Sequence, residues 1–304
     1  MTSPAPAPLL PALAVATTIL VWAAAFPAIT LALAGMTPLP LAAARFAMAA
    51  TLAALWLLWR RPGRMPAADL ALCAACGLLG GAGYAVFLNL GQTTVSAGAA
   101  SFLVKTESLW MALLGVLALR EAFNAWAWGG TLLGFAGVAV IGSAQPGGIA
   151  LGGGAVFVLA AAACSAVAFV LQRRLVQKYG AMQVAAVMFL AAALALSPWL
   201  PQAAAQLQAA TPAVRGWVVF LGILPTTVGL LCWTYAMGQF GAARAGNFLY
   251  LVAPLAMALA WPMSGETPAP ATLAGGALVL LGVMLVNTRG RRPASMAATA
   301  EAER

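Results

Sequence analysis

The sequence has no histidine and few charged residues. Only 7% of the 304 residues are charged, 63% are hydrophobic, and the mean hydropathy is +0.96. A soluble domain carries about 25% charged residues, so this chain lacks the side chains to cover a water-facing surface. The missing histidine excludes a histidine metal site, a Ser-His-Asp triad and a histidine proton relay. The composition therefore predicts an all-α integral membrane protein and argues against an enzyme.

Thiol chemistry and nucleotide binding also lack a signal. The four cysteines all lie inside apolar runs. Cys73 and Cys76 form a C-x-x-C, but their apolar flanks are typical of a membrane helix and not of the thioredoxin strand-to-helix turn. The glycine-rich stretch at 147–154 has no strand-and-helix context for a phosphate site, and the sequence has no Walker motif. We therefore expect no metal and no cofactor.

Apolar runs bounded by charges or turn residues predict ten transmembrane helices, because a helix needs about 20 residues to cross a bilayer. The expected spans are 9–33, 39–59, 68–89, 96–119, 124–142, 151–172, 181–200, 214–236, 243–264 and 270–288. Residues 1–8 contain no Lys or Arg, and the run that follows is too long for the apolar core of a signal peptide. The first span is therefore expected to be retained.

The net charge of +9 reflects membrane topology and not nucleic-acid binding, because the basic residues form short clusters between apolar runs. Of the 15 basic residues, those on one side of the ten-span arrangement are Arg60, Arg61, Arg64, Arg120, Arg173, Arg174, Lys178, Arg244, Arg289, Arg291, Arg292 and Arg304. The opposite loops contain only Arg215, while Arg45 and Lys105 lie inside spans. Basic loops stay in the cytoplasm, so both termini are expected there.

The two halves of the chain carry an internal duplication. Residues 102–113 align with residues 248–259 at an offset of 146, with six identities in twelve positions. Five spans in each half is an odd number, so the second half must enter the membrane in the opposite sense. We expect an N-terminal cytoplasmic tail at 1–8, a first five-helix repeat at 9–142, a linker loop at 143–150, a second repeat at 151–288 and a basic cytoplasmic tail at 289–304. Such inverted repeats are typical of transporters.

Several motifs recur in a known transporter family. The first half has Val-Trp-Ala-Ala-Ala-Phe-Pro at 21–27, Ala-Ala-Arg-Phe at 43–46, Ser-Ala-Gly-Ala-Ala-Ser-Phe-Leu at 96–103 and Arg-Glu at 120–121. The second half has Ala-Arg-Ala-Gly-Asn-Phe-Leu at 243–249, Ala-Pro-Leu at 253–255 and Gly-Glu at 265–266. Over nearly its whole length the chain resembles the EamA branch of the drug/metabolite transporter superfamily.

This resemblance implies export of small solutes, commonly amino acids and related metabolites, through a central cavity between the two halves. Within the family, the chain resembles the aromatic amino acid and metabolite exporter type. One departure stands out: where the second half has Pro254, the first half has Ser108, preceded by Lys105 and Glu107.

Lys105 is the strongest candidate for substrate binding, because a charged group near the bilayer centre normally faces a cavity or a partner. Gly98, Ser101, Lys105 and Ser108 repeat at three- and four-residue steps and would form one small or polar helix stripe. Lys105 would then point into the cavity and could meet a substrate carboxylate. Snorkelling and an internal ion pair are the alternatives.

Glu107 and Arg45 are expected to have structural or gating roles. On an unbroken helix, Glu107 lies about 200° around the axis from Lys105. Arg45 lies at a similar depth in the second span, so a buried Arg45–Glu107 pair that holds two helices together is the favoured interpretation.

The remaining candidates are polar, aromatic or proline residues inside spans. Asn247 belongs to the equivalent stripe of the ninth span, and Tyr250 lies alongside it. Trp22 and Phe26 would form an apolar cavity wall. Tyr84 and Ser165 are further substrate-binding candidates. Pro27 and Pro254 each leave a backbone carbonyl without its helical hydrogen bond. Either the helix kinks there or the free carbonyl binds a ligand. Glycine pairs at 77 and 81 and at 130 and 134 are interpreted as helix-packing sites.

Together these features predict a secondary transporter that exports small metabolites, most of all aromatic or other hydrophobic amino acids, by alternating access across the bacterial inner membrane. A transporter for a drug or a sugar derivative, a membrane-embedded enzyme acting on lipids or isoprenoids, and a channel or scaffold are the alternatives. The expected partners are a small-molecule substrate and the lipid bilayer, without nucleic acid. A monomer is compatible with the sequence, which leaves the oligomeric state open.

Overall fold

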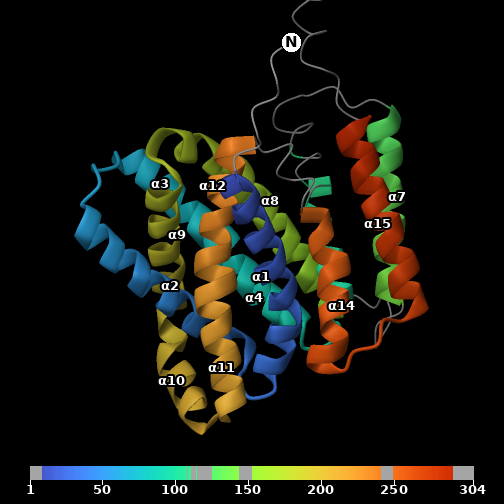
Figure 1. The fold of residues 1–304 in the computed structure, drawn as a ribbon, viewed down its shortest axis with the longest axis horizontal. Helices are drawn as coiled ribbons and strands as arrows, with labels where there is room; N and C mark the ends of the chain where they lie inside the picture. The colour runs from blue at the N-terminus through green and yellow to red at the C-terminus, as the bar shows by residue number, and fades with distance from the viewer. Residues whose placement is uncertain are drawn as a thin grey trace, which may run out of the picture.

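A computed structural model of the protein describes residues 9–107, 109–110, 114, 125–143, 153–240 and 249–289. The described residues form helices joined by short turns and contain no strand (Figure 1). The first half comprises α1 (Leu9–Leu33), α2 (Pro38–Arg60), α3 (Ala67–Cys76), η1 (Gly77–Gly83), α4 (Tyr84–Gly91), α5 (Ala97–Val104) and α7 (Ala125–Ser143). The second half comprises α8 (Gly154–Tyr179), α9 (Ala181–Leu196), η2 (Ser197–Trp199), α10 (Leu200–Ala209), α11 (Pro212–Leu221), η3 (Gly222–Gly229), α12 (Leu230–Phe240), η4 (Leu249–Leu251), α14 (Val252–Ser264) and α15 (Pro270–Thr288).

Six helical segments in the described part of the chain are long and apolar enough to cross a membrane. They are Leu9–Leu33, Pro38–Arg60, Ala67–Gly91, Gly154–Tyr179, Ala181–Ala209 and Pro212–Ala236. Shorter apolar helices cover Trp128–Ile141, Val252–Ser264 and Pro270–Leu285. Each of these nine segments overlaps one of the predicted spans, and the remaining predicted span, at 96–119, is described only in part.

Helical structure continues beyond the ends of two predicted spans. α8 runs on past residue 172 to Tyr179, where Gly180 ends it with a positive φ of 81°. After α9 the chain makes the short 3-10 turn η2 and then forms α10, where a loop was expected. Pro201 lies in the first turn of α10, where proline removes no helical hydrogen bond. Both segments are less apolar than the segments before them, so the span predicted from hydropathy stops before the helical structure does.

Two π-helical segments occupy matching positions in the two halves. η1 begins at Gly77 between α3 and α4, and η3 begins at Gly222 between α11 and α12, an offset of 145 residues. This offset is within one residue of the sequence repeat. π-Helical turns leave irregular backbone hydrogen bonding and often occur at functional sites. In η3, the hydroxyls of Thr226 and Thr227 donate to the carbonyls of Leu221 and Gly222.

Glycines bring several helices into close contact. A Cβ atom on Gly137 of α7 would meet the Gly275 backbone of α15, and one on Gly282 would meet the backbone of Gly130 and Gly134. A Cβ on Gly77 would meet the Met188 backbone of α9. The interpretation of these glycine pairs as packing sites is confirmed, since the absent side chains let the backbones approach.

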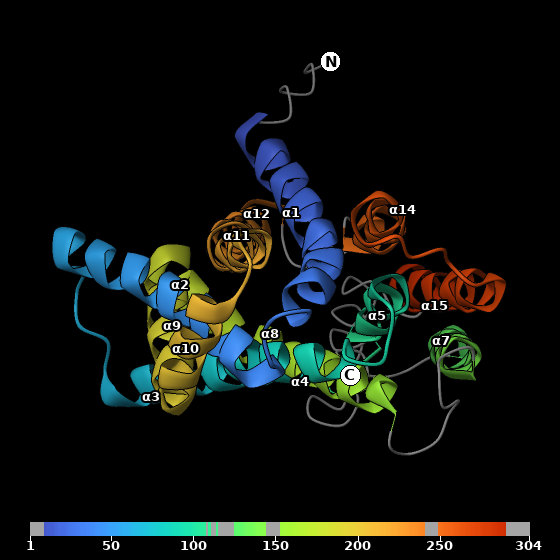
Figure 2. The same cartoon turned by 90° about the horizontal axis from the view of Figure 1, so that it is seen from below.

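Viewed along its helices, the molecule separates into three groups (Figure 2). α2, α3, α9 and α10 lie together at one end, and α5, α7, α14 and α15 lie at the other. α1, α4, α8 and α12 lie between these groups, with α1 against α12 and α14 and with α4 against α8. The central helices therefore come from both halves of the chain, and the cavity lies among them.

Candidate functional site

A cavity of about 110 Å³ lies among the central helices. It is bordered by α1, α2, η1, α4, α8, α9, η3, α12, the end of α5 and the start of α14. Its walls comprise Trp22, Ala25, Phe26, Ile29, Arg45, Phe46, Gly80, Gly81, Tyr84, Ala85, Leu88, Val104, Lys105, Glu107, Ser165, Ala168, Phe169, Gln172, Met188, Phe189, Pro225, Thr226, Leu230 and Val252. Three of these residues carry charge: Arg45, Lys105 and Glu107.

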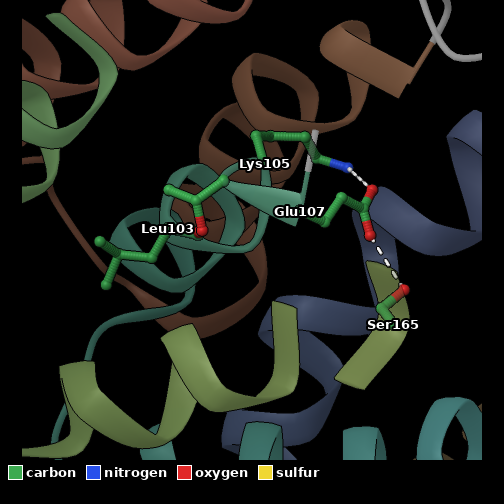
Figure 3. Close-up of polar contacts among 5 residues, drawn as sticks. Leu103, Lys105, Glu107 and Ser165 are labelled. Carbon is green, nitrogen blue, oxygen red and sulfur yellow. Dashed lines mark hydrogen bonds and ion pairs between the residues drawn. The ribbon is translucent and has the colours of Figure 1, made fainter. Parts of the chain in front are cut away.

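Lys105 and Glu107 form an ion pair at the cavity wall, directly after the end of α5 (Figure 3). The Lys105 Nζ lies 3.9 Å from the Glu107 Oε1, and the Ser165 hydroxyl of α8 donates to the Glu107 Oε2 at 3.0 Å. Lys105 is 3% exposed and Glu107 is 6% exposed. Removing two charges from water costs several kcal/mol per ion, and the attraction between two closely paired charges can offset this cost. The pair therefore keeps both charges tolerable at this depth.

This pairing differs from the expectation that Glu107 points away from Lys105 and pairs with Arg45. That expectation assumed one unbroken helix through this region. Instead α5 ends at Val104, and the backbone N–H groups of Lys105 and Thr106 donate to Phe102 and Leu103, three residues back. The tighter turn brings the side chains of Lys105 and Glu107 together (Figure 3). The prediction that Lys105 faces the cavity agrees with the structure.

Arg45 of α2 faces the cavity from another side, and it is 5% exposed. Its Nε and Nη2 donate to the Thr226 hydroxyl oxygen of η3 at 3.3 and 3.1 Å. Its Nη1 has no hydrogen-bond partner among the described residues. Tyr84 lines the same cavity. Arg45 thus links the two halves of the chain through Thr226.

Aromatic side chains form the apolar part of the cavity. Trp22 and Phe26 lie one turn apart on α1 and both line it, as the sequence predicted. The Trp22 ring lies 5.7 Å from the ring of Trp233, which lies 6.4 Å from the ring of Phe169 on α8. The Trp22 indole N–H donates to the Pro225 carbonyl at 3.0 Å. The cavity therefore offers an aromatic wall as well as a charged cluster.

Several predicted site residues lie elsewhere. Ser101 is fully buried between α5 and α14, where its hydroxyl donates to the carbonyls of Gly98 and Ala253. This part of the expected stripe therefore packs against α14, whereas Lys105 lines the cavity. Pro27 is buried in α1 but does not line the cavity. Pro254 lies exposed in the first turn of α14, where proline removes no helical hydrogen bond. Ser108, Asn247 and the side chain of Tyr250 lie outside the described residues.

The cavity residues that the sequence reasoning missed include two polar ones, Gln172 and Thr226. Gln172 is 1% exposed, and its Nε2 has no partner among the described residues. It directly precedes Arg173 and Arg174, so hydropathy placed it at the end of a span. A polar Thr-Thr pair inside the apolar eighth span was the available signal for Thr226.

The sequence profile of the EamA-like transporter family matches residues 9–143 and again residues 152–288. The chain belongs to this family. Among its relatives, a protein of Streptantibioticus cattleyicolor named "probable terminal-alkyne amino-acid exporter" is 37% identical over 90% of this chain and 93% of its own length. The "uncharacterized transporter YdfC" of Bacillus subtilis is 32% identical over 86% of each chain.

Comparison with solved structures agrees on the fold. A protein crystal structure covering 93% of this chain and 98% of its own length superimposes with a TM-score of 0.61 at 21% identity, which speaks for the fold alone. The family and the named relatives make this EamA protein a multi-pass membrane transporter of small molecules and not an enzyme.

Proposed function

We propose that this EamA protein exports amino acids with aromatic or other hydrophobic side chains across the bacterial inner membrane by alternating access. The carrying observation is that one cavity holds both a charged cluster and an aromatic wall. Arg45, Lys105 and Glu107 match the charged backbone end of an amino acid, whereas Trp22 and Phe26 match an apolar side chain. The relative from Streptantibioticus cattleyicolor supports the same substrate class, since it is named a probable amino-acid exporter.

For the architecture we propose ten spans in two inverted five-helix repeats, at 9–142 and 151–288, with both termini in the cytoplasm. The double match of the family profile and the matching positions of η1 and η3 support this arrangement. Two related halves around one cavity can exchange conformations and expose the cavity to each side of the membrane in turn. The Arg45–Thr226 and Trp22–Pro225 hydrogen bonds would then join the halves in one of these states.

Transport in a purified system tests this proposal. The protein is reconstituted into proteoliposomes preloaded with unlabelled amino acid, and uptake of labelled L-phenylalanine, L-leucine, L-propargylglycine, L-lysine and L-aspartate is followed. We expect uptake of the first three at rates well above those of protein-free liposomes, with little uptake of the last two. The variant Arg215→Gln is the matched control, because Arg215 is exposed and its bonds to described residues go to the nearby carbonyls of Leu207 and Gln208. No uptake of any amino acid by the folded protein would overturn the proposal.

A further inference from the structure

Arg45 is a buried cation without a carboxylate partner in the described part of the chain. The ion pairs found there join Lys105 to Glu107 and Lys178 to Asp69, and neither involves Arg45. A charged side chain at membrane depth is costly unless it is paired or faces a cavity that a ligand or water can enter. Arg45 lines the cavity, so its missing partner is expected to come from there.

Thr226 fixes the guanidinium while leaving one edge of it unused. The Thr226 hydroxyl proton is donated to the Leu221 carbonyl at 2.7 Å, so its oxygen acts as an acceptor toward Arg45. Both Nε and Nη2 of Arg45 donate to this one oxygen, and Nη1 has no partner among the described residues. A guanidinium held in this way is oriented in advance for a planar, two-oxygen acceptor such as a carboxylate.

Of the three charged residues that line the cavity, Lys105 and Glu107 pair with each other, and Arg45 is the cation that remains without a carboxylate among the described residues. Lys105 and Glu107 form an ion pair at 3.9 Å, and the Ser165 hydroxyl donates to the same carboxylate. A substrate carboxylate that bound Lys105 would have to compete with Glu107. One that bound Arg45 would displace no carboxylate from it and would satisfy a buried donor.

We propose that Arg45 is the carboxylate anchor of the transported amino acid, with Thr226 as the residue that positions it. This assignment rests on the proposed function, and it transfers the carboxylate-binding role from Lys105, the sequence-based candidate, to Arg45. In the conformation described, Nη1 is closed off from water, so the substrate reaches it as the cavity opens.

The test compares each amino acid with its carboxamide, which keeps the ammonium and the side chain but lacks the carboxylate. The probes are L-phenylalanine, L-leucine and L-propargylglycine, each paired with its amide, in proteoliposome uptake and in competition assays. For the wild type we expect each acid to be preferred over its amide at least about tenfold, the strength of one hydrogen bond between charged groups. In Arg45→Gln the acids should weaken by about ten- to a hundredfold while the amides change little, so the preference disappears.

Two further variants separate anchoring from folding. Arg45→Lys keeps the charge but loses the planar fork, so it should retain part of the preference. Thr226→Val keeps the guanidinium but removes its orienting oxygen, so it should weaken the acids a few-fold more than the amides. Arg215→Gln should leave the preference unchanged. If Arg45→Gln gives no monodisperse protein, the wild-type acid-to-amide ratio and Thr226→Val decide the question.

The outcomes distinguish this proposal from the proposed function. If the wild type transports amino acids but accepts acid and amide equally, or if folded Arg45→Gln keeps the preference, the anchor is wrong and the transport function stands. If Arg45→Gln weakens acid and amide to the same extent, Arg45 is a structural residue and the anchor is likewise wrong. If the wild type transports none of the amino acids, both proposals fall together.

Discussion

The indole N–H of Trp22 donates to the backbone carbonyl of Pro225, 3.0 Å away, and thereby joins the first half of the chain to the second. Pro225 lies in the π-helical segment η3, where the irregular backbone leaves carbonyls available for such bonds. The same segment presents Thr226 to Arg45. Two cavity-wall residues of the first half are therefore held by one irregular segment of the second half.

Replacing Trp22 with Phe should destabilise the protein and alter transport together. The phenyl ring keeps an aromatic wall but leaves the Pro225 carbonyl without its donor, a loss of about 1 kcal/mol for one hydrogen bond. For a chain of this size, that corresponds to a melting temperature lower by roughly 2–4 °C in detergent. Because the bond joins the two halves, we also expect a changed transport rate.

The matched control for this change is Trp59→Phe, since Trp59 is 76% exposed at the end of α2 and lies outside the cavity. It should shift neither the melting temperature nor the transport rate. Equal effects of the two substitutions would show that the Trp22–Pro225 bond has no special role.

The Lys105–Glu107 pair predicts strong coupling in a double-mutant cycle. Lys105→Met leaves the buried Glu107 carboxylate unpaired and should destabilise the protein by about 3–5 kcal/mol if it folds at all. Glu107→Gln should do the same by leaving Lys105 unpaired. The double variant Lys105→Met/Glu107→Gln carries neither charge, so it should be more stable than either single variant. Thermal unfolding in detergent measures all four proteins.

Transport by the double variant then reports whether the pair has a role beyond stability. If Glu107 receives the substrate ammonium, the double variant is folded but transports poorly. Additive losses of stability in the cycle would contradict the ion pair itself, because independent residues do not couple.

The sequence predicted much of the fold because hydropathy and charge act over long stretches of chain. The apolar run at 9–33 coincides with α1, and the run at 39–59 differs from α2 by one residue at each end. Isolated polar or aromatic residues inside spans also identified much of the site: Trp22, Phe26, Arg45, Tyr84, Lys105, Glu107 and Ser165 all line the cavity. A charged side chain inside a membrane span must face a cavity or a partner, so its position in the sequence indicates where the cavity lies.

The predicted side-chain directions were wrong where a helix breaks locally. The prediction for Ser101 and Glu107 used an ideal helix of 100° per residue, but the chain turns at Lys105 and Thr106. The sequence marks that break only with Thr106, whose hydroxyl donates to the Leu103 carbonyl at 2.7 Å, and with no Gly or Pro. The partner of Arg45 was missed for a related reason: Thr226 lies 181 residues away, in a π-helical segment that no periodicity reveals.

The proposed topology predicts the behaviour of reporter fusions. A fluorescent protein fused after Arg64 or after residue 304 should fluoresce, because both sites are expected in the cytoplasm. Alkaline phosphatase fused after Ala210 should be active, because the turn between α10 and α11 is expected outside. The reverse pattern at all three sites would invert the orientation, and opposite signals at Arg64 and residue 304 would contradict the number of spans between them.

Glycine packing between α7 and α15 gives a prediction with its control on the same helix. A Cβ atom on Gly137 would overlap the Gly275 carbonyl and the Val279 backbone nitrogen, neither of which can rotate away. Gly137→Ala should therefore destabilise the protein by about 1–3 kcal/mol, the usual effect of overpacking. On the same helix, a Cβ on Gly129 would meet nothing within 4 Å. Gly129→Ala should be neutral or stabilising by up to about 1 kcal/mol, since alanine favours the helix. In thermal unfolding, the melting temperature should fall for Gly137→Ala but not for Gly129→Ala, and equal shifts would contradict the close α7–α15 contact.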